Sequence, residues 1–233
     1  MTIDVLTELY HKDQFLHGTD SCQIVEKQEN ATLTEATFRL EGADLIVCSN
    51  ETIWNHGVGL YAKESPVHRF EFRRACDGFV ICTYEGQKYL VWIELKSSFN
   101  EVFDKAIYQL SGCYVKMKSY LSCFSDYRPE DYKELGIVVS RPEEQYLGED
   151  GNAAVEGRRD SLITDLENPT DICRSDYRNA STPNTFFLRG KDFGIKNTHI
   201  SDSISLGTLP IYYYETNDNT PTIDLGPILA MVK

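Results

Sequence analysis

The sequence predicts a mixed α/β domain, because a strongly patterned β-hairpin is followed by a long amphipathic helix and then by a short apolar strand. The hairpin strands are FVICTY (79–84) and YLVWIEL (89–95), and the apolar strand is ELGIVVSR (134–141). Between them, from about 101 to 122, apolar residues recur every three or four positions, which is the helical period. A nearly all-apolar strand is typical of one buried within a mixed sheet.

The chain has 233 residues, with 41% hydrophobic and 25% charged side chains, which is ordinary globular composition. We expect one domain over 1–233, with a core at about 69–141 plus 209–215, an N-terminal elaboration at 1–68 and a polar insertion at about 142–205. No apolar run approaches the roughly 18 residues needed to cross a bilayer. The segment MTIDVLTELYHKDQF lacks the basic start of a signal peptide. We therefore expect a cytoplasmic protein that contacts no membrane.

Further elements are predicted on either side of the hairpin and helix. Short strands are expected at 22–27, 36–40, 44–48, 69–73 and 209–215. We also expect short helices at 2–10 and 157–166, a last element at 226–232, and Asn100 as the N-cap of the long helix.

The hairpin turn is predicted at Gly86–Gln87, with Gly86 at the first central position of a type II′ turn. Glu85 then pairs with Lys88. The same register continues toward the open end of the hairpin, where the strands carry charged residues.

This register places Asp77 opposite Lys96 and Phe79 opposite Glu94. Directly opposed residues share a face of the sheet, and so do alternate residues along one strand. Asp77, Glu94 and Lys96 are therefore predicted to converge at one end of the hairpin. A one-residue slip would send Asp77 to the other face.

Such a cluster is suited to metal-assisted chemistry. Two carboxylates a few ångströms apart repel each other, and buried unpaired charges are costly, so the pair favours a bound cation. Mg²⁺ is commonly held by one or two carboxylates plus waters and phosphate oxygens, and it can polarise a phosphate and lower the pKa of a water. Lys96 could orient or deprotonate that water, or stabilise developing negative charge. These are the groups that phosphodiester hydrolysis needs.

Asp77, followed seventeen residues later by Glu94-Leu95-Lys96 at the end of an apolar strand, resembles the PD-(D/E)XK nuclease superfamily. The resemblance covers about 69–141 and implies a restriction-endonuclease-like core, a central mixed β-sheet flanked by helices. It implies that Asp77, Glu94 and Lys96 are catalytic. It also implies that Asp77, Glu94 and the backbone carbonyl of Leu95 bind Mg²⁺ or Mn²⁺.

Smaller features fit this resemblance in part. Ser97 resembles the small hydroxyl residue that is common after the lysine. Gln109 with Tyr114 resembles the Gln-x-x-x-Tyr element of RecB-like members, but the spacing is one residue too long. Cys76 stands where the motif name has proline.

Four more residues are candidates for supporting roles. Arg73 and Arg74 lie next to the motif and are candidates for phosphate contacts or for ordinary salt bridges. Some members of the superfamily use an additional upstream acid, for which Glu51 or Glu71 would serve.

The formal net charge of −13 is unusual for a nucleic-acid-binding protein, because phosphate contacts come from Lys and Arg. Residues 1–59 have a net charge of −7 and residues 126–233 of −8, whereas residues 60–125 have +2. The only non-acidic region contains the motif. We expect a nucleic-acid substrate, with DNA favoured over RNA, and a protein partner or a homodimer that supplies basic surface.

Seven cysteines are an odd number, and no two have C-x-x-C spacing, so they are predicted to be small buried hydrophobes. Their positions are 22, 48, 76, 82, 113, 123 and 173. Five scattered histidines give no zinc pattern.

The sequence thus predicts a Mg²⁺-dependent deoxyribonuclease, which by analogy would serve a defence or restriction system. One alternative is a ribonuclease or repair nuclease with the same site. Another is a non-catalytic acidic interaction protein that retains a nuclease-like fold.

Overall fold

The computed structural model describes residues 15–27, 29, 31–49, 75–97, 106–141, 184–188, 209–230 and 232. These residues form a mixed α/β fold with a central β-sheet and few helices, which confirms the predicted class. The elements predicted at 2–10, 69–73 and 157–166, and the cap at Asn100, lie outside the described residues.

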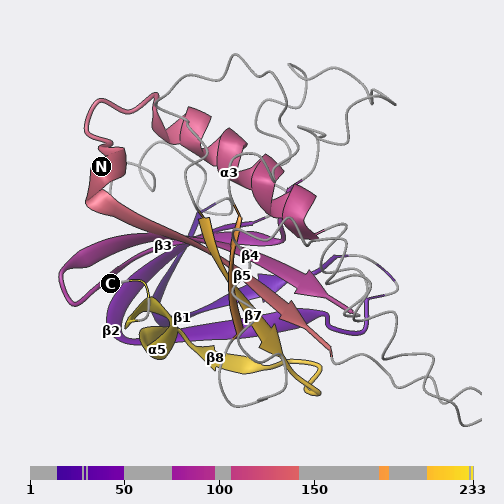
Figure 1. Cartoon of the computed structure of the whole chain (residues 1–233). Coiled ribbons are helices and arrows are strands. Elements are labelled where there is room, and N and C mark those ends of the chain that lie inside the picture. Colours follow the sequence, from indigo (N-terminus) through magenta and orange to yellow (C-terminus); the bar gives the residue numbers. More distant parts are fainter. Residues whose placement is uncertain are drawn as a thin grey trace, which may run out of the picture.

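The described strands form one sheet of eight, in the order β1-β2-β3-β4-β5-β7-β6, with β8 paired to β2 (Figure 1). Their bounds are β1 Phe15–Val25, β2 Glu35–Ser49, β3 Gly78–Tyr84, β4 Gln87–Lys96, β5 Tyr132–Ser140, β6 Asn184–Leu188, β7 Leu209–Glu215 and β8 Thr222–Asp224. The pairs β4–β5 and β5–β7 are parallel, whereas β1–β2, β2–β3, β3–β4 and β6–β7 are antiparallel. The carboxyl ends of β4, β5 and β7 therefore meet at one edge.

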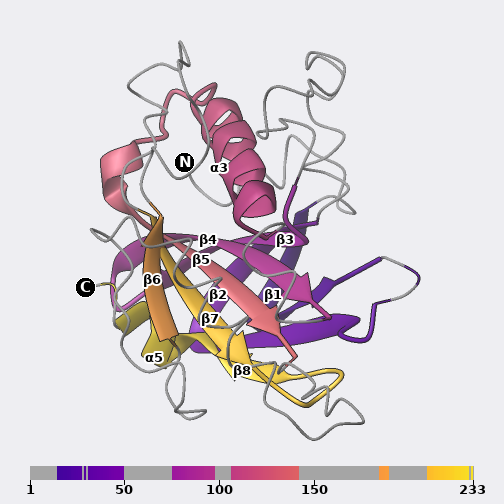
Figure 2. The same ribbon diagram turned by 45° about the vertical axis from the view of Figure 1, so that its right-hand side comes forward.

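Two helices lie on opposite sides of this sheet. Helix α3 (Ile107–Leu121) connects β4 to the parallel strand β5 and crosses one face, as Figures 1 and 2 show. A Cβ on Gly136 of β5 would lie 3.2 Å from Ile211 Cγ1 of β7 and 3.4 Å from Leu110 Cδ1 of α3, so the glycine avoids crowding under the helix. Helix α5 (Leu225–Ala230) packs its buried residues into the cluster on the opposite face.

Strand β4 is buried on both faces, as its apolar pattern predicts. Leu90 and Trp92 belong to the cluster under α3. Val91 and Ile93 belong to the cluster that contains α5. The alternation fixes which side chains of β4 face α3, and it extends to the charged residues at the end of the strand.

The predicted hairpin turn is wrong by one position. Tyr84 pairs with Gln87, so the turn residues are Glu85 and Gly86, with φ of 48° and 79°. Positive φ at both central residues is a type I′ turn, whose twist matches that of the strands and which takes glycine readily at its second position. The pairing consequently shifts by two residues, and Phe79 lies opposite Trp92 instead of Glu94.

The strands predicted at 36–40 and 44–48 are parts of the single strand β2, and 22–25 are the end of β1. The chain does not turn between these two segments. Strand β2 continues through them, and only its pairing with β1 is irregular there. The β1–β2 register shifts between Thr19 and Ser21, and Asp20 Oδ1 accepts a hydrogen bond from Gly42 N at 2.8 Å. Asp20 and Gly42 both have positive φ, so the bulge locally replaces regular pairing.

The predicted strands at 134–141 and 209–215 are confirmed as β5 and β7. Strand β6 lies within the predicted insertion 142–205, whose other residues are not described, and it pairs with β7. The element expected at 226–232 overlaps helix α5, while the short strand β8 was not predicted.

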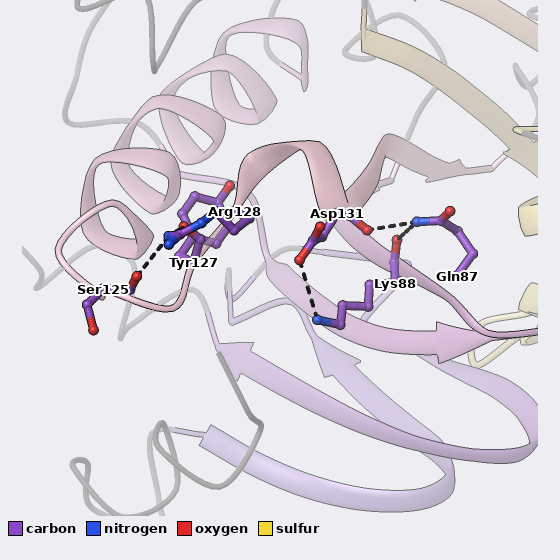
Figure 3. Close-up of polar contacts among 6 residues, drawn as sticks. All are labelled: Gln87, Lys88, Ser125, Tyr127, Arg128 and Asp131. Carbon is purple, nitrogen blue, oxygen red and sulfur yellow. Dashed lines mark hydrogen bonds and ion pairs between the residues drawn. The ribbon is translucent and has the colours of Figure 1, made fainter.

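The beginning of β4 is held by the loop that follows α3 (Figure 3). Gln87 Nε2 donates to the carbonyl of Asp131 at 2.8 Å, and Lys88 Nζ lies 3.8 Å from Asp131 Oδ2. Arg128 donates to the carbonyl of Ser125 at 2.8 Å and so closes the loop. These contacts fix the amino-terminal end of β4, whereas Glu94 lies near its carboxyl-terminal end.

Five of the cysteines are buried, as predicted: Cys22, Cys48, Cys76, Cys82 and Cys113. Cys123 is exposed, because it lies just beyond the end of α3 and off the face that packs on the sheet. Cys173 lies outside the described residues. Among the described helices, none is long and apolar enough to cross a membrane.

Candidate active site

Asp77, Glu94 and Lys96 lie together where β3 begins and β4 ends. Their side chains are almost fully buried, with exposed fractions of 2%, 0% and 6%. Glu94 and Lys96 alternate along β4 and project from the face that Leu90 and Trp92 share. Three ionisable groups so deeply buried are unusual unless they are paired or bind a cation.

Asp77 reaches the backbone between the other two residues. Its Oδ2 accepts a hydrogen bond from the amide N–H of Leu95 at 2.7 Å. Asp77 precedes the first paired residue, Gly78, which lies opposite Ile93. Continuing that pairing puts Asp77 opposite Glu94, whereas the predicted register put it opposite Lys96. A shift of two residues preserves the face of the sheet.

Lys96 and Glu94 form a direct ion pair. Lys96 Nζ donates to Glu94 Oε1. Glu94 Oε2 is buried and has no hydrogen-bond partner among the described residues. One oxygen of this carboxylate is thus occupied by the ammonium, while the other is open to a further ligand.

Negative charge is in excess at this site. Burial, reinforced by the nearby Asp77, raises the pKa of Glu94 well above its ordinary value. Burial and the charge of Glu26 raise the pKa of Asp77 to about 7, although the Leu95 N–H and Lys96 act against this. Burial alone would lower the pKa of Lys96, but Glu94, Asp77 and Glu26 outweigh it and raise that pKa. All three shifts indicate that the site favours additional positive charge.

Glu26 is a site residue that sequence reasoning missed. It forms a side-chain hydrogen bond with Asp77 and contributes to the raised pKa of that carboxyl. The candidates for an extra acid, Glu51 and Glu71, lie outside the described residues. The position of Glu26 at the end of the predicted strand 22–27 was the available signal, but its proximity to Asp77 depends on strand order.

Close packing brings Glu26 to this position. A Cβ on Gly78 would lie 2.2 Å from Ile24 Cδ1, so β1 occupies space that any side chain at Gly78 would fill. The segment after Glu26 also contacts the end of β4. Thr32 N donates to Ser97 Oγ at 2.8 Å, so the predicted Ser97 joins the end of β4 to this segment.

Gln109 lies close to the site. Its Nε2 donates to the carbonyl of Ala75 at 3.4 Å, two residues before Asp77. Cys113, one turn further along α3, forms a side-chain hydrogen bond with Cys76. Helix α3 thus holds the segment that leads into Asp77.

Tyr114 belongs to a different group of residues. It forms a side-chain hydrogen bond with Glu134, which also pairs with Lys118. Glu134 lies opposite Leu90 in the β4–β5 register, four residues before Glu94. Tyr114 therefore connects α3 to the beginning of β5 and not to the carboxylate cluster.

Few of the cations expected near the site are on the described surface. Arg73 and Arg74 lie outside the described residues. Lys116 and Lys118 of α3 are buried, with exposed fractions of 2% and 5%. Burial lowers the pKa of Lys116 to about 8, and Lys118 is neutralised by Glu134.

Beside Lys96 lies a row of polar residues that sequence reasoning also missed. Lys96 is in register with Ser140 of β5, and Ser140 is in register with Glu215 of β7. The Tyr213 hydroxyl lies 3.2 Å from Ser140 Oγ and 3.3 Å from Glu215 Oε2. The available signal was a polar residue at or just after the end of each of the predicted strands 89–95, 134–141 and 209–215.

The donor set fits a hard divalent cation. No group of three or more His, Cys, Asp or Glu side chains in the described residues is arranged to hold a metal ion. Mg²⁺, however, commonly uses only one or two carboxylates and completes its shell with water and substrate oxygens. The two carboxylates of Asp77 and Glu94 meet that requirement, the latter through its unpartnered Oε2.

Comparison of the chain with known families, curated proteins and solved structures finds no match. The interpretation of the site therefore depends on its geometry and on the motif.

Proposed function

We propose that this chain is a Mg²⁺- or Mn²⁺-dependent nuclease of the PD-(D/E)XK type, with DNA as its favoured substrate. The observation that carries the proposal is the burial of Asp77, Glu94 and Lys96 together at the open end of one hairpin. The order β2-β3-β4, then α3, then the parallel β5 supports a restriction-endonuclease-like core.

Asp77 and Glu94 would hold the cation, with the carbonyl of Leu95 as a third ligand. In a paired strand the N–H and C=O of one residue point toward the same neighbour. Because the Leu95 N–H is bonded to Asp77, its carbonyl points toward the side on which Asp77 lies. When bound, the cation would polarise the scissile phosphate and lower the pKa of the attacking water.

Lys96 would supply the positive charge that phosphodiester hydrolysis requires. Its ammonium has three donors at the end of a flexible stem and lies at the cluster. It can hydrogen-bond a phosphate oxygen as negative charge develops, a role that is typically worth several kcal/mol when the donor is already positioned.

Glu26 and Gln109 would position these groups. Glu26 hydrogen-bonds Asp77, whose raised pKa lets that carboxyl keep a proton near neutral pH, so cation binding at Asp77 would release that proton. Gln109 holds Ala75 and thereby the approach to Asp77.

The alternative is a non-catalytic acidic interaction protein with a nuclease-like core. The net charge of −13 and the burial of Lys116 and Lys118 favour this alternative. Incubation with plasmid, linear duplex, single-stranded DNA and RNA, each with Mg²⁺, Mn²⁺ or EDTA, tests both functions. Metal-dependent cleavage that EDTA abolishes supports the nuclease, and its substrate preference separates DNA from RNA. No cleavage of any substrate with either metal contradicts it.

A further inference from the structure

The ion pair between Lys96 and Glu94 conflicts with metal binding at Glu94. The ammonium occupies Glu94 Oε1, in a site where Glu94 is fully buried. A divalent cation on the same carboxylate would repel the ammonium strongly at such a short distance. A cation on the unpartnered Oε2 therefore weakens the hold of Glu94 on Lys96, and a buried ammonium that loses its partner is costly unless a second carboxylate receives it.

The row beside Lys96 offers a carboxylate that could receive it. Lys96, Ser140 and Glu215 are successive register partners on three parallel strands, so their side chains share one face. Lys96 and Glu215 are two strand spacings apart, roughly 10 Å between backbones. A lysine and a glutamate side chain extended toward each other can bridge that separation.

Glu215 is held in place for this role. The Tyr213 hydroxyl lies within hydrogen-bond distance of Glu215 Oε2, and Tyr213 itself is only 3% exposed. Ser140, on the strand between them, donates its hydroxyl to the carbonyl of Arg141 at 2.7 Å, so its oxygen offers the ammonium only a neutral acceptor, whereas Glu215 offers a negative charge. Within the described part of the chain Glu215 forms no ion pair. It is also half-buried, so pairing there avoids full desolvation.

We propose that Glu215 is a positioning residue that accepts the Lys96 ammonium when Glu94 binds a divalent cation and no substrate phosphate is bound. This inference rests on the proposed metal site. It assigns the Tyr213–Glu215 pair to the function of the site, and it explains how one lysine can neutralise Glu94 in the metal-free protein without blocking the cation.

Glu26 is the competing acceptor. It contributes to the electrostatic environment of Lys96 and forms a hydrogen bond with Asp77. The test must therefore separate Glu215 from Glu26, and it must also separate both from a general loss of negative charge. Glu130 is an exposed acid in the short helix Pro129–Asp131, at the opposite end of β4, and it provides the control.

The experiment uses the full chain with ¹³C-labelled lysine and follows the Lys96 ε-carbon signal by NMR during Mg²⁺ titration, with affinity from calorimetry. Lys96→Arg assigns the signal. In the wild-type protein and in Glu130→Gln, we expect Mg²⁺ to shift this signal to a single new position, which reports the pair between Lys96 and Glu215. Glu215→Gln should abolish that position and weaken Mg²⁺ binding about tenfold, the lower end of what a partner beyond the ligands contributes. Glu215→Asp should keep part of the signal shift and part of the Mg²⁺ affinity. Tyr213→Phe should lose part of both.

Two results would overturn the inference. One is a Glu215→Gln protein, folded by circular dichroism, with wild-type affinity and an unchanged Lys96 shift. The other is loss of the shifted signal in Glu26→Gln but not in Glu215→Gln, which would make Glu26 the acceptor. A wild-type protein that binds no Mg²⁺ refutes the metal site itself, and this failure is distinct because it appears before any variant is compared.

Discussion

The carboxylate of Asp77 accepts a hydrogen bond from the backbone N–H of Leu95 at 2.7 Å, so one candidate ligand binds the peptide group that joins Glu94 to Leu95. At the end of a sheet this amide would otherwise lack a partner, since β3 is paired only from Gly78 onward. Asp77 thus has a structural role and a proposed catalytic role, and substitutions can separate them.

Asp77→Ala and Asp77→Asn should differ in stability. Alanine leaves the Leu95 N–H unpaired in a buried site, which typically costs about 1–3 kcal/mol. Asparagine keeps an acceptor oxygen and removes a charge from an over-acidic cluster, so the metal-free protein should retain or gain stability. Urea unfolding in EDTA at pH 7.5 measures both. Equal destabilisation by the two substitutions would show that the hydrogen bond does not matter.

Stability of the metal-free protein should fall as pH rises from about 4 to 7. Burial raises the pKa of Asp77 to about 7 in the folded protein, whereas a carboxyl of the unfolded chain titrates near 4. The folded state therefore retains a proton that the unfolded chain releases, and the free energy of unfolding falls by up to about 1.4 kcal/mol per pH unit. Glu94 contributes in the same direction.

Other carboxyls also titrate over this range, so the informative quantity is the difference between wild type and Asp77→Asn. Urea unfolding from pH 4.5 to 8 in EDTA should show the wild type losing stability relative to the variant as pH rises. A difference that is independent of pH would mean that Asp77 titrates normally.

Lys96→Ala should abolish cleavage and leave metal binding intact or tighter. The substitution removes an ammonium that competes for Glu94, while both carboxylates remain. Glu94→Gln should weaken binding and cleavage together, and losses of a catalytic group are typically orders of magnitude in rate. Single-turnover cleavage with calorimetric metal titration separates the two effects. Full activity in a folded Lys96→Ala protein would exclude Lys96 from the mechanism.

The pair Lys118–Glu134 should stabilise the fold more than the pair Lys88–Asp131. The side chains of the first pair are 6% and 18% exposed, and those of the second 41% and 49%. Glu134→Gln leaves a buried ammonium without its counter-charge and should cost about 2 kcal/mol or more. Asp131→Asn should cost less than about 1 kcal/mol. Thermal unfolding of both variants compares them, and similar losses would contradict the ranking.

The isolated chain should bind duplex DNA weakly, with a shallow dependence on salt. Its net charge is −13, and burial removes Lys116 and Lys118 from the cations available for phosphate contacts. Fluorescence anisotropy at 50 to 200 mM salt measures the slope. Tight binding with a steep slope would reveal a broad basic surface and remove the need for a partner or a dimer.

The sequence predicted the face shared by Glu94 and Lys96, because alternation along a strand is local. It placed Asp77 on that side as well, although the turn lies at Glu85–Gly86, since a two-residue shift preserves parity. The sequence did not predict that Glu26 and Glu215 lie near the site. Their positions depend on which strands neighbour β3 and β5, and no local pattern specifies that order.

The most direct test of the proposed site is Mn²⁺ binding, followed by electron paramagnetic resonance, to the wild-type protein and to Glu94→Gln and Asp77→Asn. The account predicts stoichiometric binding by the wild type, competition by Mg²⁺, and loss in both variants with the fold retained. Wild-type protein that leaves Mn²⁺ free in solution, or binding that survives both substitutions, would contradict it.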